Sequence, residues 1–445
     1  MSKLSLFRPS LLRSSLCRPG LSTLRFAFVA AACALFALPA LADSQVRIVR
    51  LSDVQGAVQI NKNNGMGFEN AFLNLPITQG TQVRTHDRGR AEIEFEDGST
   101  LRLIPDTTVE FSTLGLSDSG QRITVVNLVE GMAYVNWLGK DEFALTFSNE
   151  KISIDHAAHF RLDASTEAAS LAVFKGEVAV DGSAGKFMIE KKTTATFNAV
   201  DDDKYTLAGN ITEAPLDSWD RDASAYHDQY ARNNSSNNLS PFAYGMSDMN
   251  YYGAFSNVPG FGMMWQPFFA GAGWDPFMDG AWSWYPGYGY MFASAYPWGW
   301  MPYHYGSWMM IPGNGWMWQP GGFNTWLAAP HVGGTLPANF HPLVAPAAGT
   351  LKTVAIGKAE SIADAPPTRI AAGSAGLGIP RGSLDNLSHL NHQVAKAGFA
   401  EVRMAPPFST SASKSPEWFA PLSNSTSGTT AHSTSSGHVA GGSHH

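Results

Sequence analysis

Cysteine is almost missing from this 445-residue chain: its two copies, Cys17 and Cys33, both lie in the first 42 residues. The rest of the chain therefore holds no disulfide, no cysteine-ligated zinc and no cysteine nucleophile. Charge is scarce as well, because 15% of the residues are charged against about 25% in an average soluble protein. Glycine and proline are abundant, with 43 and 26 copies. This is not the composition of a standard cytosolic protein.

The chain also lacks a long hydrophobic run. An apolar stretch over 26–38 has 13 residues, fewer than the roughly 20 that a membrane-spanning helix needs. It follows Arg13, Arg18 and Arg25 and precedes Ala40-Leu41-Ala42, which is the pattern of a cleavable export signal. We therefore predict that residues 1–42 are a signal peptide, with no stable membrane span after cleavage. The alternative is a lipoprotein that is cut before Cys33.

Positive charge is in deficit once the signal is removed. Residues 1–42 contain five bases and no acid, which leaves 25 bases against 37 acids and a net charge of −12. Such a chain lacks the basic surface that binds phosphate backbones, so we predict no nucleic-acid partner.

Residues 43–210 alternate in the manner of β-strands between Gly, Asp and Asn turns. The clearest hairpin spans 91–103, with apolar and acidic residues on opposite faces. A three-residue loop Asp97-Gly98-Ser99 keeps the faces consistent. It predicts the pairs Phe95 with Leu101, Ile93 with Leu103 and Glu94 with Arg102.

Two further segments, 129–135 and 174–180, share a glycine at the third position and a valine at the seventh. With the turn glycines of 80–103, they resemble the FecR domain of bacterial exported proteins over about residues 46–197. The resemblance implies an all-β domain, either a compact sandwich or a short β-helix-like roll. One departure is Ala158-His159-Phe160, where many members have a Gly-Thr pair.

The hydrophobic period changes after the β region. Trp219, Ala223, Tyr226 and Tyr230 are spaced by four, three and four residues, which predicts one face of a short linking helix over 214–233.

Residues 240–326 hold 10 of the 13 tryptophans, and no lysine or arginine occurs between Arg232 and Lys352. A Trp-x-Trp-x-Pro unit recurs three times, and its rings form a candidate structural ladder: Trp282, Trp284, Trp298, Trp300, Trp316 and Trp318. In an extended chain both rings lie on one face, and the proline ends strand pairing. We therefore predict a small repeat β-domain of stacked hairpins.

This segment resembles the Trp/Tyr/Gly/Pro repeat domain of the DUF6600 type that follows a FecR domain in many exported bacterial proteins. The motif over 298–308 carries most of the resemblance, which implies no activity. Most tryptophans are expected in the core, because an exposed, uncharged set would aggregate. Tyr303, Tyr305 and Trp308 are the candidate binding surface, since Tyr and Trp suit half-burial. Whether the rings are core or binding platform stays open.

Residues 330–445 are rich in Ala, Pro, Ser, Gly and Thr, and we predict a low-complexity, mostly disordered tail. The complete fold expectation is mainly β, with an N-terminal FecR-like all-β domain, a linking helix, a small aromatic repeat β-domain and this tail.

Three clusters could carry chemistry, and each has a simpler explanation. The acidic row Glu92, Glu94, Glu96 and Asp97 lacks the spacing of a calcium loop and is predicted to be an exposed strand face. His156 and His159 lack a third ligand and are predicted to lie in a polar loop. The ten methionines between 246 and 317 could bind Cu(I) beside His304, but they are expected to pack against rings. We predict no catalytic residues, no metal and no cofactor.

The sequence thus favours a non-enzymatic binding or scaffolding protein of the bacterial cell envelope, periplasmic, secreted or at the cell surface. An envelope protein or a polysaccharide is the expected partner. A polysaccharide-binding module acting through exposed aromatics is one alternative. The other is a FecR-like component regulating a sigma factor from the periplasm. Signalling members need a cytoplasmic segment and a retained membrane helix, and a cleaved signal would leave neither.

Overall fold

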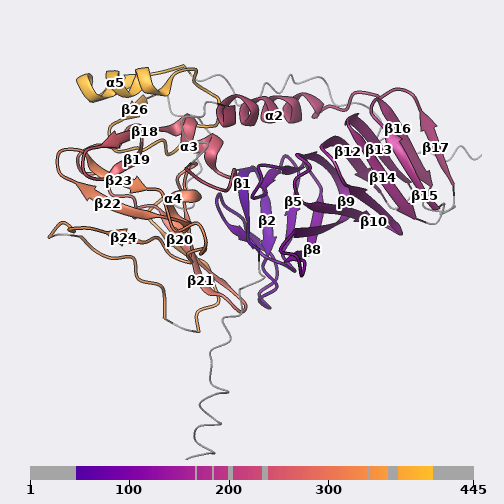
Figure 1. The fold of residues 1–445 in the computed structure, drawn as a ribbon, viewed down its shortest axis with the longest axis horizontal. Helices are drawn as coiled ribbons and strands as arrows, with labels where there is room; N and C mark the ends of the chain where they lie inside the picture. Colours follow the sequence, from indigo (N-terminus) through magenta and orange to yellow (C-terminus); the bar gives the residue numbers. More distant parts are fainter. Residues whose placement is uncertain are drawn as a thin grey trace, which may run out of the picture.

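The computed structural model describes residues 47–165, 168–182, 185–198, 204–232, 239–338, 340–347, 349–358 and 369–403. The protein is mostly β, as predicted, with a large β region, a smaller aromatic β region beside it and a helix, α2, that runs along the top of the β region (Figure 1). The predicted signal peptide lies outside the described residues.

Two sheets build the β region. The first has the spatial order β4 (Pro76–Ile77), β1 (Val49–Gln55), β6 (Arg90–Glu94), β7 (Thr100–Leu103), β9 (Arg122–Trp137), β12 (Ala158–Ala164), β13 (Ala168–Lys175), β16 (Thr193–Asn198) and β17 (Tyr205–Ala208). The second has the order β3 (Glu69–Asn70), β2 (Val58–Asn61), β5 (Gln82–Thr85), β8 (Thr108–Leu116), β9, β10 (Glu142–Phe147), β11 (Glu150–Ile154), β14 (Glu177–Gly182) and β15 (Gly185–Glu190). Apolar residues of both sheets share one core.

Strand β9 belongs to both sheets. Residues 122–130 pair with β8 and β10, whereas residues 131–137 pair with β7 and β12. The change falls at Gly131, which has φ 91°. A Cβ atom there would lie 2.5 Å from the Asp106 carbonyl oxygen, so the position requires glycine. Gly131, the glycine that the segments 129–135 and 174–180 share at their third position, is thus the point where one strand changes sheets.

The hairpin of β6 and β7 keeps the predicted faces but not the predicted register. The pairs are Glu92 with Arg102, Ile93 with Leu101 and Glu94 with Thr100. The Phe95 amide donates to the Ser99 carbonyl at 2.9 Å, so the loop is Glu96-Asp97-Gly98 rather than Asp97-Gly98-Ser99. The two registers differ by two residues, which preserves the side-chain alternation. Asp97 caps the turn instead, accepting from the Ser99 amide and hydroxyl at 2.9 Å each.

Gly98 has φ 90° in this turn. Gly98→Val should therefore destabilise the protein by about 1–3 kcal/mol, the usual cost of a strained backbone site, in denaturant unfolding of a chain of residues 43–445. Gly98→Asn is the control, because it adds the same Cβ but tolerates the left-handed conformation. Equal losses for the two variants would show that the space beside Ala243, rather than φ, sets the cost.

Helix α2 (Asp217–Arg232) is the linking helix that the spacing predicted. Trp219, Ala223 and Tyr226 are buried on one face, and Tyr230 is half-buried.

The aromatic region consists of hairpins, as the repeats indicated. One sheet has the order β18 (Gly253–Val258), β19 (Gly262–Pro267), β23 (Gly315–Gln319), β22 (Ser307–Ile311) and β24 (Val332–Gly333), and another β21 (Gly289–Ser294), β20 (Gly280–Tyr285) and β25 (Val354–Ile356). Helix α3 (Met246–Tyr252) precedes them. Two Trp-x-Trp units lie on β20 and β23, each followed by its proline. The third does not form a strand: Trp300 precedes the short helix α4 (Met301–His304), with Pro302 inside that helix.

Five of the six ladder tryptophans are buried, and Trp284 is half-buried. Trp298 is central, with ring centroids 4.8 Å from Trp265, 5.0 Å from Tyr296 and 6.0 Å from Trp308. The rings of the described residues therefore form the core of this region.

His304 lies in the same core and is fully buried. Its Nδ1 lies 2.8 Å from the Leu327 carbonyl, and burial lowers the pKa of His304 to about 3. Below the unfolded-state value of about 6.5 the unfolded chain therefore binds a proton that the folded chain does not. We therefore expect the free energy of unfolding to decrease as the pH is lowered below about 6.5, by up to about 1.4 kcal/mol per pH unit.

Urea unfolding between pH 7 and pH 5 measures this slope. His304→Asn keeps a donor near the Nδ1 position but cannot titrate, so its slope should be smaller by that amount. Equal slopes would mean that His304 does not titrate on unfolding.

The expectation of a mostly disordered tail from residue 330 is wrong in two places: β24 and β25 pair with strands of the aromatic region, and residues 369–403 are folded as well. Strands β26 (Arg369–Ala371) and β27 (Phe399–Glu401) pair, and helix α5 (Leu387–Ala397) lies between them in sequence. Ile370, Ile379, Leu387 and Val394 join the aromatic core. Scattered apolar residues in a weakly patterned sequence suffice here because the aromatic region supplies the surface they bury. Residues 404–445 lie outside the described part.

Candidate functional site: a cleft beside a buried charge network

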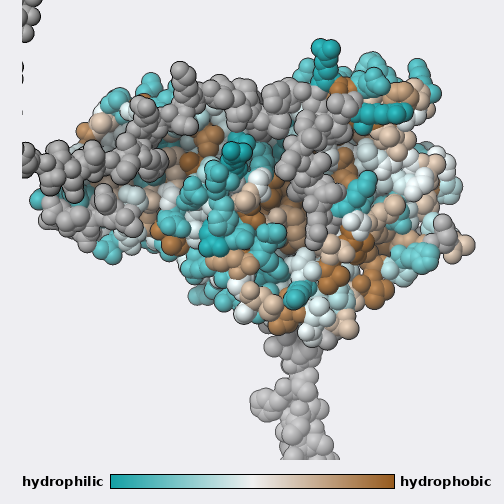
Figure 2. Space-filling view, turned by 180° about the vertical axis from the view of Figure 1, so that it is seen from behind, coloured by the Kyte–Doolittle hydropathy of each residue, from teal (hydrophilic) through white to brown (hydrophobic). Residues whose placement is uncertain are grey.

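The predicted binding surface is not at the surface. Tyr303, Tyr305 and Trp308 are 0%, 4% and 0% exposed. The Tyr303 hydroxyl donates to the Pro276 carbonyl at 2.5 Å, and the Tyr305 and Tyr244 hydroxyls lie 2.6 Å apart. The hydroxyls of the two tyrosines are thus satisfied inside the protein, which removes the reason for half-burial, whereas Trp308 Nε1 is buried without a hydrogen-bond partner among the described residues. On the face in Figure 2, hydrophobic residues over the aromatic region form small groups among polar ones.

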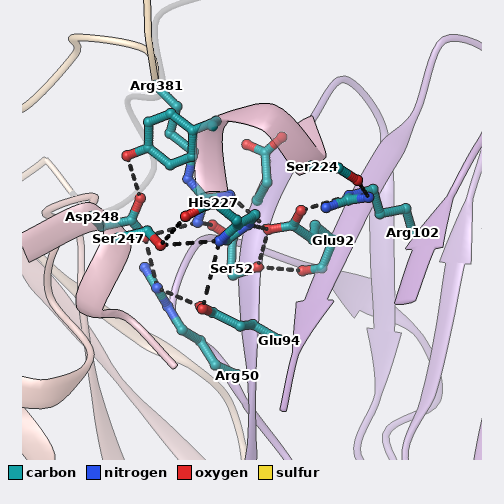
Figure 3. Close-up of polar contacts among 12 residues, drawn as sticks. Arg50, Ser52, Glu92, Glu94, Arg102, Ser224, His227, Ser247, Asp248 and Arg381 are labelled. Atoms are coloured by element: carbon teal, nitrogen blue, oxygen red, sulfur yellow. Dashed lines mark hydrogen bonds and ion pairs between the residues drawn. The ribbon is translucent and has the colours of Figure 1, made fainter. Parts of the chain in front are cut away.

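The acidic row is buried too, contrary to the exposed face that we predicted. Glu92 and Glu94 are 1% exposed, and Glu96 and Asp97 are 5% exposed. Helices α2 and α3 and the segment around Arg381 cover this face of the first sheet, bringing partners from far along the chain (Figure 3). Buried carboxylates require such partners.

Glu92 is the centre of the network. Its carboxylate accepts from Arg102 Nε at 2.7 Å, from Arg381 Nη1 at 2.7 Å and from the Ser52 hydroxyl at 2.7 Å, and it lies 2.9 Å from His227 Nε2. Burial alone would raise the pKa of Glu92, but His227, Arg102 and Arg381 outweigh it and hold the pKa well below its usual range. Glu92 therefore stays ionised.

A second part of the network joins the β region to α3. Arg50 Nη1 lies 3.1 Å from Glu94 and 2.7 Å from Asp248, and Arg381 Nη2 donates to Asp248 at 2.8 Å. Arg50 Nη2 also donates to the Pro297 carbonyl at 2.7 Å. One arginine of β1 thus bonds to the aromatic region through both a carboxylate and a backbone carbonyl.

A third part fixes α2. Asp220 accepts from Arg102 Nη1 at 2.7 Å and lies 2.6 Å from His159 Nε2. Asp217, at the first position of the helix, accepts from Arg161 Nη1 at 2.5 Å. His159, which sequence reasoning placed in a polar loop, is buried against α2, whereas His156 is exposed.

A cleft of about 1060 Å³ lies next to this network. Its walls come from β1, β2 and the segment 69–73 of the β region, from Tyr252, Ala281 and Ala295 of the aromatic region, and from 352–358 and 377–381. The volume is at the upper end of the roughly 300–1000 Å³ of ordinary ligand sites. Sequence reasoning missed the cleft, because no local motif marks residues that meet only in the fold.

Charged groups of the cleft mostly serve the structure. Arg381 bonds to Glu92 and Asp248, and Glu69 pairs with the buried Lys62. Burial raises the pKa of Asp53, with Arg381 partly offsetting the effect, and Gln55 Nε2 donates to Asp53 at 2.8 Å. The arrangement suits holding a ligand between apolar walls with polar groups at fixed positions.

In the described part of the chain, three or more His, Cys, Asp or Glu residues never gather closely enough to hold a metal ion. Within the same residues, every helix is too short or too polar to cross a membrane.

Comparison with known proteins gives two family matches. The model "FecR protein" matches residues 81–179, inside the range that the turn glycines predicted. The model "Family of unknown function (DUF6600)" matches residues 246–337. No curated protein matches the chain.

Two solved structures of a "putative anti-sigma factor" from Parabacteroides distasonis ATCC 8503, at 2.50 and 1.65 Å resolution, are similar to part of the chain. Each is 18% identical with a TM-score of 0.27, covering 33% of this chain and 71% or 72% of the other. A likeness at this level carries no functional argument. The family models are found in the chain one after the other, FecR at residues 81–179 and DUF6600 at residues 246–337.

Proposed function

We propose that this protein is an exported, non-enzymatic binding protein of the bacterial cell envelope, and that the cleft between its two β regions holds the partner. The observation that carries the proposal is the cleft itself, about 1060 Å³ in volume and formed by three parts of the chain. The buried charge network beside it fixes those parts relative to one another, so the cleft is formed before a ligand arrives. A FecR segment is compatible with export.

A bulky side chain in the cleft tests this proposal. Ala57 is exposed and lines the cleft, so Ala57→Trp should occupy it without disturbing the core. Ala208→Trp, at an exposed position of β17, is the matched control. The mature chain is screened against arrays of envelope polypeptides and of envelope oligosaccharides. We expect a ligand whose binding is lost in Ala57→Trp and kept in Ala208→Trp; binding that survives Ala57→Trp throughout would refute the cleft as the site.

A FecR-type signalling role is the second candidate, favoured by the FecR match. It differs from the first in what happens to residues 1–42. Cleavage after Ala42, which the sequence predicts, would leave an exported binding protein. N-terminal sequencing of the protein isolated from the envelope decides between them, because a retained N-terminal segment supports signalling.

A further inference from the structure

One strand at the cleft has an unpaired edge. Strand β1 pairs with β6 from Arg50 to Gln55, with a shift of register at Ser52, but with β4 only at Val49 and Arg50. On that second side the Leu51 amide still donates to Leu75, and its carbonyl accepts from Asn74. Beyond Leu51 the described residues supply no further strand there. The stretch Ser52–Gln55 therefore has a sheet neighbour on one side alone.

This edge faces the cleft. Four consecutive residues, Ser52, Asp53, Val54 and Gln55, line it. A strand that showed its face to a cavity would contribute every second residue, because successive side chains point to opposite faces. Ser52 lies at the shift of register, and the contribution of Asp53, Val54 and Gln55 in succession indicates that the strand presents its edge, where backbone N–H and C=O groups are directed outward.

A side chain already uses that edge at one end. Arg381 Nη2 donates to the Ser52 carbonyl at 2.6 Å, so this carbonyl is directed away from β6 and accepts a hydrogen bond from across the cleft. This contact occupies the edge of the strand at Ser52. The backbone groups on the same edge from Asp53 to Gln55 remain for hydrogen bonds with another chain. The part of the edge that can form new hydrogen bonds therefore begins after Ser52.

The volume of the cleft is large enough for a short added strand. A residue in a packed sheet occupies about 3.4 Å along its strand, about 4.8 Å across it and about 10 Å between layers, so about 1060 Å³ corresponds to about six residues. The walls beside the edge include Phe72, Leu73, Tyr252 and Ile379, which suit apolar side chains. At the mouth, Lys352 is exposed and has no ion pair among the described residues, so an acidic side chain is complementary there.

We infer that the cleft binds an extended polypeptide of about six residues, which adds a strand to β1, with apolar side chains at alternate positions and an acidic residue beside Lys352. This rests on the proposed function and names its ligand class. Backbone hydrogen bonds would supply affinity, and the alternate side chains specificity.

Selective N-methylation tests the inference, because a strand uses the amides of alternate residues on each edge. The probes are acetylated hexapeptide amides of alternating Thr and Val with Glu or Lys at either end, and their binding to the mature chain is measured by isothermal titration calorimetry. N-methylation of the odd or of the even residues blocks one edge at a time. We expect Glu-ended peptides to bind, at least a tenfold loss for one methylation set, and little loss for the other.

Three further measurements accompany the peptide-binding experiment. Lys352→Glu should reverse the preference from Glu-ended to Lys-ended peptides, and Ala57→Trp should abolish binding while Ala208→Trp does not. Hydrogen exchange at Asp53 to Gln55 should slow when a peptide is bound. Equal effects of the two methylation sets, or no binding by any hexapeptide, would overturn strand addition. The cleft would remain the binding site if some other ligand still depended on Ala57, so the two failures are distinguishable.

Discussion

Trp300→Ala should destabilise the folded protein by about 3–5 kcal/mol, the usual cost of truncating a buried tryptophan. The indole is fully buried, with ring centroids 5.4 Å from Tyr244, 4.5 Å from His304 and 6.2 Å from Trp326. Its Nε1 makes no hydrogen bond among the described residues, so the loss is one of packing. Denaturant unfolding of residues 43–445, monitored by near-ultraviolet circular dichroism, measures this loss of stability.

Trp284→Ala is the matched control, because Trp284 belongs to the same repeated unit but is half-buried. Trp284→Ala should lower the free energy of unfolding by clearly less than Trp300→Ala does. Tyr303→Ala and Trp308→Ala should resemble Trp300→Ala, since both side chains are fully buried. If Trp300→Ala and Trp284→Ala shifted the midpoint equally, burial would not explain the role of the repeated tryptophans.

Glu92→Ala should destabilise the folded protein about as much as Trp300→Ala, by about 3–5 kcal/mol, because it leaves buried cations without their partner. Arg102 and Arg381 both bond to this carboxylate, and His227 lies against it. The loss should appear as a lower midpoint in denaturant unfolding at pH 7.

At acid pH, the free energies of unfolding of Glu92→Ala and of the parent protein should become equal. The folded-state pKa of Glu92 lies below its unfolded value, so its stabilisation is present above about pH 4.5 and is lost as the pH falls through the folded pKa. Glu177→Ala, at an exposed position of β14, is the control and should change little at any pH. A Glu92→Ala midpoint equal to that of Glu177→Ala would show that the network adds nothing to stability.

Much of the fold could be predicted because its patterns are local. Alternation placed Ile93 on the core face, and the spacing of Trp219, Ala223 and Tyr226 identified the buried face of α2. The hairpin register was missed by two residues. Both registers give the same alternation, so pattern alone could not distinguish them, and the choice depended on how Asp97 caps the turn.

The site could not be predicted, because its residues meet only through long-range contacts. Glu92 and Glu94 alternate with apolar residues in the manner of a solvated face, and nothing nearby shows that Arg381 covers them. Tyr303, Tyr305 and Trp308 were assigned to the surface because their polar groups need partners. The structure supplies partners for the two tyrosines internally, and a single sequence does not reveal this.

The bond between Arg381 and Glu92 spans 289 positions of the chain, which has a consequence for the order in which the protein can mature. A chain synthesised from its N-terminus presents β6 long before residue 381 emerges. Until then the acidic row lacks one of its cations, and the sheet face that it lines stays hydrated. Final assembly of the β region therefore waits for nearly the whole polypeptide. A product truncated before Arg381 would keep the cover that α2 and α3 supply but lack the part beside Glu92 and Asp248, where a protease can distinguish it from the finished protein.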